Sequence, residues 1–209
     1  MLYGSSKNLS RKTLKSYEQT LKMFAIYLEE HFKITEVSKV KSAHIRYYIK
    51  YLRERGKYTV VLNEKTAKVN HPDHRHDFNK PISDTTVSNY LRNIKVFFNY
   101  LYEVEREIKV NPVESIENIK PQRKHKPLLK SEEIVKVLRT FDITTFHGYR
   151  NWIITRLLLD TGMRISECLS ITPENFDFKN KAILITNSKN RQQRYVYFSF
   201  KMSRDDAIP

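Results

Sequence analysis

The sequence holds little of what marks a secreted or membrane-bound protein. It has a single cysteine, Cys168, which cannot form a disulfide within the chain and lies in an apolar stretch where a buried, reduced thiol is expected. No uncharged apolar run is long enough to cross a bilayer. No N-terminal segment combines a basic start, an apolar stretch and a small-residue cleavage site. The sequence therefore predicts a cytoplasmic protein with no membrane partner.

Positive charge is what the sequence has in excess. Its 38 Lys and Arg against 23 Asp and Glu give a formal net charge of +15. The excess is spread along the chain, since residues 1–120 contain 22 basic and 14 acidic side chains and residues 121–209 contain 16 and 9. Such a balance favours a polyanion over a neutral metabolite as partner. It also occurs where charge serves solubility alone, so the motifs must decide.

Apolar spacing predicts a helical first domain. Steps of three and four residues indicate a helix over residues 10–32 and a second from Ser42, its N-cap, to Gly56, which would adopt the left-handed C-terminal conformation. Ser83 should cap a third, long helix. The apolar positions expected on the buried faces of these helices are Leu14, Tyr17, Leu21, Phe24, Leu28, Ile45, Tyr48, Ile49, Leu52, Val87, Tyr90, Leu91, Ile94, Phe97, Phe98 and Leu101.

Residues 57–81 interrupt this helical pattern. Residues 58–62 are rich in β-branched and aromatic side chains, and the polar remainder indicates an inserted loop or hairpin. The insertion contains His71, His74 and His76, which suggests zinc. With no cysteine nearby and no helical i, i+4 pair of ligands, however, we predict no metal site.

A basic linker divides the chain. After a short turn at Asn111-Pro112-Val113, the stretch 120–128 contains two prolines and four cationic side chains. The predicted domains are therefore residues 1–119, including the insertion at 57–81, and residues 129–209. In the second, we expect helices from Ser131, over Tyr149–Asp160 and from Ile165, followed by a hairpin of strands Ala182–Thr186 and Arg194–Phe198.

The most specific motif is Leu159-Asp-Thr-Gly-Met-Arg-Ile-Ser-Glu-Cys-Leu169. Gly162 permits a tight turn, so Arg164 can leave the helix and present its planar guanidinium to a phosphate. A lysine would lack that bidentate fork. The stretch resembles the first arginine box of the tyrosine recombinases of the phage-integrase type, in which T-G-x-R-x-S-E follows an apolar helix.

Two further segments resemble the same family. Ser188-Lys189-Asn190 followed by Arg194-Tyr-Val-Tyr-Phe198 is similar to the family's hairpin, in which a catalytic lysine in a G-K-G-like turn precedes R-x-V-P-L. Here Ser188 and Asn190 replace the glycines, and Tyr197 stands where proline is common. Residues 83–101, followed by Asn111-Pro112-Val113, are similar to the family's core-binding domain. The resemblance covers roughly residues 10–200.

The resemblance implies a mainly α fold, with an N-terminal helical (SAM-like) core-binding domain and then a truncated α+β catalytic domain with a small β-hairpin. It implies that Arg164 clamps the scissile phosphate, that Lys189 protonates the departing 5′ oxygen and that Glu167 orients the arginine. It implies no cofactor, because attack by a tyrosine conserves the energy of the broken bond. Other recombinase protomers on DNA are implied partners.

The family's H-x-x-R box, its second His or Trp and its nucleophilic tyrosine follow the hairpin, and none of them follows Phe198 in these 209 residues. Strand alternation explains Tyr195 and Tyr197 without any chemistry. The resemblance therefore implies a DNA-binding portion that acts in integration and recombination of a mobile element but does not cleave DNA alone. A non-enzymatic regulator that occupies recombination sites fits equally well at the level of DNA binding, and a basic helical nucleic-acid or scaffold protein is a third hypothesis.

Duplex DNA is the expected partner in the first two of these readings. Dispersed cations on both domains would bind its phosphates. The candidates are Lys41, Arg46, Arg92, Lys95, Arg123, Lys124, Lys126, Arg191 and Arg194.

Overall fold

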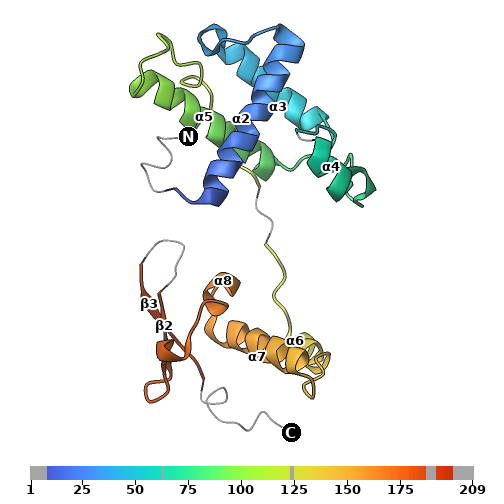
Figure 1. The fold of residues 1–209 in the computed structure, drawn as a ribbon, viewed down its shortest axis with the longest axis vertical. Helices are drawn as coiled ribbons and strands as arrows, with labels where there is room; N and C mark the ends of the chain where they lie inside the picture. Colours follow the sequence, from blue (N-terminus) through green and yellow to red (C-terminus); the bar gives the residue numbers. More distant parts are fainter. Residues whose placement is uncertain (1–8, 63, 123–124, 187–191, 200–209) are drawn as a thin grey trace. The chain divides into compact units, whose positions relative to one another are not determined.

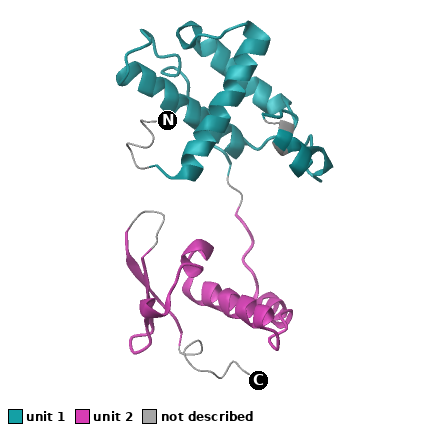
Figure 2. Ribbon diagram, in the orientation of Figure 1, with its two compact units in different colours: residues 1–124 teal, residues 125–209 magenta. Residues whose placement is uncertain are grey.

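The computed structural model describes residues 9–62, 64–122, 125–186 and 192–199. The chain divides into two compact units, residues 1–124 and residues 125–209 (Figure 2). The division falls within the stretch 120–128 that composition marks as a linker. Within the described ranges, no helix has both the length and the apolar content needed to cross a bilayer.

Three long helices build unit 1: α2 (Arg11–Phe32), α3 (Ser42–Glu54) and α5 (Asp84–Glu103), which pack on one another (Figure 1). Most of their predicted apolar positions meet in one core, whereas Leu14, Tyr17 and Leu21, near the start of α2, are half-buried and lie outside it. The ring of Phe24 on α2 lies 4.9 Å from that of Tyr48 on α3 and 6.3 Å from that of Phe98 on α5. The prediction of a helical first domain is confirmed.

The ends of the helices in unit 1 follow side-chain capping. The Ser10 and Ser83 hydroxyls accept hydrogen bonds from main-chain N–H groups three residues ahead, at 3.1 and 3.3 Å, as predicted for Ser83. Lys41 rather than Ser42 is the residue that precedes α3. A short 3-10 helix, η1 (Val37–Lys39), connects α2 to α3.

The end of α3 corrects the sequence interpretation. The helix stops at Glu54, and Gly56 does not take the left-handed conformation expected of it. Gly56 instead forms an antiparallel bridge with Pro81, and a Cβ added to it would lie 2.0 Å from Asn79 Oδ1. The residue is therefore required for close approach of two chain segments rather than for a helix cap.

The insertion differs from its predicted form as well. The strand expected at residues 58–62 is absent among the described residues, because this run has no neighbouring strand with which to pair. The segment forms a short helix, α4 (Glu64–Asn70), and a 3-10 helix, η2 (Pro72–His74). Hydrogen bonds from Lys57 N–H to Lys80 O (2.9 Å) and from Asn79 N–H to Lys57 O (3.0 Å) close its base.

Unit 2 combines helices with a small antiparallel sheet. Its helices are α6 (Ser131–Arg139), α7 (Phe146–Thr161), α8 (Ile165–Cys168) and the 3-10 helix η3 (Pro173–Asn175). Its strands β1 (Phe176–Asp177), β2 (Ala182–Ile185) and β3 (Arg194–Tyr197) lie in the order β1-β2-β3. The predicted hairpin is confirmed, whereas β1 and η3 were not predicted from the sequence. The fold is thus mainly helical with a small β-sheet, as the resemblance implied.

The core of unit 2 lies where α7, α8 and the sheet meet. It contains Leu157, Met163, Cys168, Ile183, Ile185 and Phe198. Burial of Cys168 agrees with the sequence, and it raises the pKa of the thiol. α7 begins three residues earlier than predicted because the Thr145 hydroxyl caps it, accepting from Gly148 N–H at 3.1 Å. Lys130 rather than Ser131 precedes α6.

Candidate functional site

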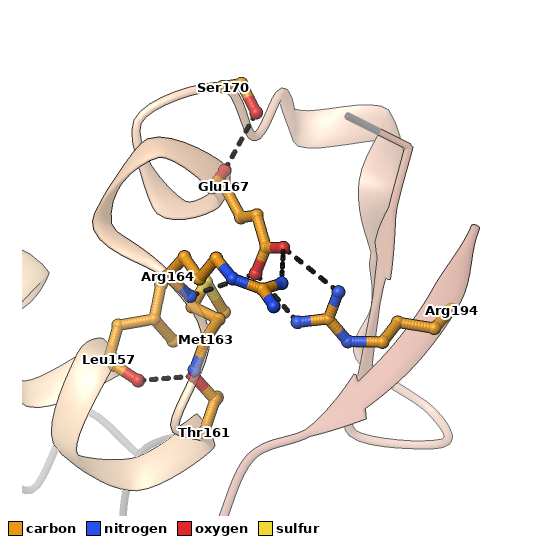
Figure 3. Close-up of polar contacts among 7 residues, drawn as sticks. All are labelled: Leu157, Thr161, Met163, Arg164, Glu167, Ser170 and Arg194. Carbon is orange, nitrogen blue, oxygen red and sulfur yellow. Dashed lines mark hydrogen bonds and ion pairs between the residues drawn. The ribbon is translucent and has the colours of Figure 1, made fainter. Parts of the chain in front are cut away.

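The turn after α7 is built around Gly162. This residue has φ 64° and ψ 15°, the left-handed conformation that ends a helix, in the place where the sequence predicted a tight turn. An added Cβ would meet nothing within 4 Å, so glycine is needed here for its backbone angles and not for space. The Thr161 hydroxyl donates to Leu157 O (2.7 Å) and accepts from Met163 N–H (3.3 Å), which fixes the turn (Figure 3). Arg164 follows directly.

Glu167 holds Arg164 in place. The carboxylate accepts from the main-chain N–H of Arg164 at 2.9 Å and from its Nη1 at 2.7 Å. The Glu167 side chain is 1% exposed, whereas that of Arg164 is 52% exposed. The buried acid thus anchors an arginine whose side chain remains accessible to a ligand.

A second guanidinium reaches the same carboxylate from the sheet. Arg194, the first residue of β3, donates from Nη1 to Glu167 Oε1 at 3.0 Å and from Nη2 to Oε2 at 2.7 Å (Figure 3). This is the two-pronged geometry in which a guanidinium matches a carboxylate. The contact joins residues 27 positions apart in the chain and fixes the start of β3 against the arginine turn.

The ionised form of Glu167 is strongly favoured. Hydrogen bonds from Arg194 lower its pKa to about 2, helped by those from Arg164, although burial opposes the shift. One negative charge therefore stands between two permanent positive charges. The cluster retains a net charge of +1 at neutral pH and attracts anions.

The two arginines differ in the donors they have committed. An arginine has five N–H donors. The contacts with Glu167 engage both terminal nitrogens of Arg194 but one side-chain donor of Arg164. Together with its exposure, this makes Arg164 the residue able to present a pair of donors to a phosphate, and Arg194 the residue that supports Glu167.

Two of the predicted DNA-binding cations contact the segment that follows α5. Arg46 Nη2 donates to the carbonyl and the hydroxyl of Ser115 at 3.4 and 3.3 Å. Lys95 Nζ donates to Ile116 O and, at 3.0 Å, to Asn118 Oδ1. These contacts hold the segment against α3 and α5.

Three other candidates are exposed: Lys41 before α3, Arg92 on α5 and Lys126 after the unit boundary. Lys189, Arg191, Arg123 and Lys124 lie outside the described residues. The structure therefore brings together Arg164, Glu167 and Arg194 from the predicted site. The pairing of Arg194 with Glu167 was not predicted. A signal was present, since an acid within the apolar stretch Ile165–Leu169 requires a cationic partner once it is buried.

Comparison with known proteins agrees with this architecture. The profile described as "Phage integrase, N-terminal SAM-like domain" matches residues 3–70, and the profile "Phage integrase family" matches residues 127–205. Together they cover most of both units. The chain belongs to the phage integrase family, that is, to the tyrosine recombinases.

The tyrosine recombinase XerC of Syntrophus aciditrophicus (strain SB) is 26% identical over 190 residues, which are 91% of this chain and 54% of the relative. The XerC of Lacticaseibacillus casei (strain BL23) is 33% identical over 124 residues, 58% of this chain and 41% of the relative. The chain thus spans about half the length of the curated relatives it matches.

Solved structures share the fold. XerH site-specific recombinase bound to palindromic difH substrate matches with a TM-score of 0.61 and 20% identity, over 94% of this chain and 51% of that one. The Tn1549 transposon integrase in complex with a circular intermediate DNA matches with a TM-score of 0.59 and 15% identity, over 95% and 59%.

Proposed function

We propose that this chain is the DNA-binding portion of a site-specific tyrosine recombinase that acts in the cytoplasm on duplex DNA, in the integration and recombination of a mobile element. The observation that carries the proposal is the exposed guanidinium of Arg164, presented by the turn at Gly162 and anchored on buried Glu167. Two of the matched structures are of recombinases bound to DNA, which supports DNA as the partner. Other recombinase protomers on the same DNA are further proposed partners.

Arg164 is the proposed ligand of the scissile phosphate. Its planar donors match two phosphate oxygens and offset the negative charge that develops as phosphorus is attacked. Glu167 keeps the guanidinium in one orientation, so little ordering is left to occur on binding. Arg194 donates hydrogen bonds to both oxygens of that carboxylate and thereby positions Glu167.

Lys189 is the proposed proton donor to the departing 5′ oxygen, on the chain between β2 and β3. In the whole protein, a tyrosine would attack the phosphate and form a 3′-phosphotyrosyl link. No H-x-x-R box and no tyrosine follow the hairpin in these 209 residues. We therefore propose that this polypeptide by itself binds DNA without cutting it.

The test of phosphate binding is a titration of labelled duplex DNA, followed by fluorescence anisotropy at several salt concentrations. If about 6 to 10 phosphates are contacted, affinity falls on the order of a thousandfold or more between 50 and 200 mM salt. Arg164→Ala should weaken binding and reduce the slope of log affinity against log salt by about 1. Arg164→Lys should keep the positive charge at this position but lose the pair of planar donors with which arginine binds two phosphate oxygens.

The matched control is Arg139→Ala, which removes an exposed arginine at the end of α6. If the slope of log affinity against log salt were equal for wild type and Arg164→Ala, Arg164 would not be one of the residues that contact DNA phosphate. The proposal that this polypeptide does not cut DNA is tested separately with a nicked duplex substrate. A protein–DNA adduct that survives denaturation would show that these residues do cut DNA.

A further inference from the structure

The insertion in unit 1 assembles three metal-ligating side chains in one short turn. His71 has φ 40° and ψ 64°, in the left-handed region, and leads into η2 directly after α4 (Figure 1). His74 N–H donates to His71 O at 2.9 Å. In a 3-10 turn, side chains three residues apart eclipse one another. The imidazoles of His71 and His74 accordingly stack, with centroids 5.0 Å apart and planes 11° apart.

The distances suit a small cation. One ligand atom each from His71, Asp73 and His74 lies within 4.8 Å of the others. The separation between Asp73 Oδ2 and His74 Nε2 is 3.6 Å. Two ligands of a tetrahedral zinc ion, each about 2.0–2.1 Å from the metal, lie about 3.4 Å apart. Rotation of the exposed side chains, which would unstack the two imidazoles and bring the ligand atoms closer by up to about 1.4 Å, would complete the geometry.

We propose that His71, Asp73 and His74 form a binding site for a divalent transition-metal ion of the zinc class. Two imidazoles with one carboxylate suit zinc, cobalt or nickel, whereas magnesium and calcium prefer oxygen ligands. All three side chains are exposed, so the remaining coordination positions are open to water or to a ligand from outside the turn.

The ligand atoms of the cluster are accessible, although Lys68 lines the hollow beside them. The neighbouring Arg75 is directed elsewhere, because its guanidinium lies 4.6 Å from the Tyr58 ring and its Nε is 3.3 Å from Asp77 Oδ1. His71 and Asp73 also border a hollow of about 420 Å³ whose apolar wall includes Phe78, so they are reachable from solvent.

The experiment uses the untagged 209-residue chain and Co²⁺, whose visible absorption reports its coordination, with Zn²⁺ as competitor and calorimetry for affinity. We expect one site per chain with micromolar affinity for Zn²⁺. His71→Ala and His74→Ala should each weaken binding at least tenfold, as removal of one ligand of three. His76→Ala, an exposed histidine of the same segment outside the cluster, is the matched control and should leave binding unchanged.

Circular dichroism of each variant establishes that the fold is retained. Zn²⁺ affinity weaker than millimolar, or equal loss in the His76→Ala control, would overturn the site. Displacement of Co²⁺ by Mg²⁺ at millimolar concentration would overturn the assignment to the zinc class.

Discussion

The two units achieve stability by different means. The core of unit 1 joins fifteen buried apolar residues from α2, α3, α5, the α2–α3 connection and the segment after α5, whereas the corresponding cluster of unit 2 contains six within the described ranges. α7 spans sixteen residues, yet Leu157 is its buried residue and Phe146 and Leu159 are exposed. Because apolar burial scales with area, unit 1 draws its stability from many side chains. Unit 2 depends more on a few contacts, among which Glu167 with its two arginines is prominent.

The largest effect is expected from Phe98→Ala in the core of unit 1, which should lower the free energy of unfolding by about 3–5 kcal/mol. Trp152, the single tryptophan, lies on α7, so its fluorescence reports on unit 2. The midpoint of denaturant unfolding detected by far-ultraviolet circular dichroism should fall strongly, while the midpoint detected by tryptophan fluorescence should stay unchanged. The exposed Val96→Ala on the same helix is the control. An equal shift of both signals would mean that the units unfold together.

Glu167→Gln should have the largest polar effect, in unit 2. Replacing the carboxylate leaves two guanidiniums without their counter-charge and a buried amide in its place. Because the Arg164 and Arg194 side chains are 52% and 39% exposed, solvent compensates in part, and we expect a loss on the order of 2 kcal/mol in the tryptophan-detected transition. Glu174→Gln, at an exposed acid of the same unit, should change it by less than about 0.5 kcal/mol.

Acidification should reproduce this loss. The folded pKa of Glu167 is lowered to about 2 from 4.5 by its arginine partners, so the unfolded chain takes up a proton first as the pH falls. The stabilisation is complete above about pH 4.5 and disappears as the pH approaches 2. The difference in unfolding free energy between wild type and Glu167→Gln should therefore shrink between about pH 4.5 and pH 2. A constant difference would show that Glu167 acts through packing alone.

Gly162→Ala should give the smallest effect. The added methyl group meets no atom within 4 Å, so the cost comes from the left-handed backbone and should be about 1 kcal/mol. Gly162→Asn should cost less, because asparagine tolerates this conformation better. Both are measured by tryptophan fluorescence. Equal stability of all three proteins would mean that the turn adopts another conformation after substitution.

Local signals in the sequence predicted much of this structure. Helical periodicity identified α2, α3 and α5, and the motif around Gly162 located the arginine turn. The failures involve contacts that no local pattern encodes. Residues 58–62 have strand-like composition but no strand beside them, and the partner of Glu167 lies 27 residues away. The proposed metal site rests on His71, which enters a 3-10 turn through a left-handed backbone conformation that no local sequence pattern shows.

The bridge between Gly56 and Pro81 has a consequence for how this chain can vary. Since the insertion leaves and rejoins unit 1 at one point, its contents can be lengthened, excised or exchanged for a tight turn without re-threading the helices beneath it. The segment can therefore be exchanged as a unit. New ligand chemistry can be acquired there without a change in α2, α3 or α5.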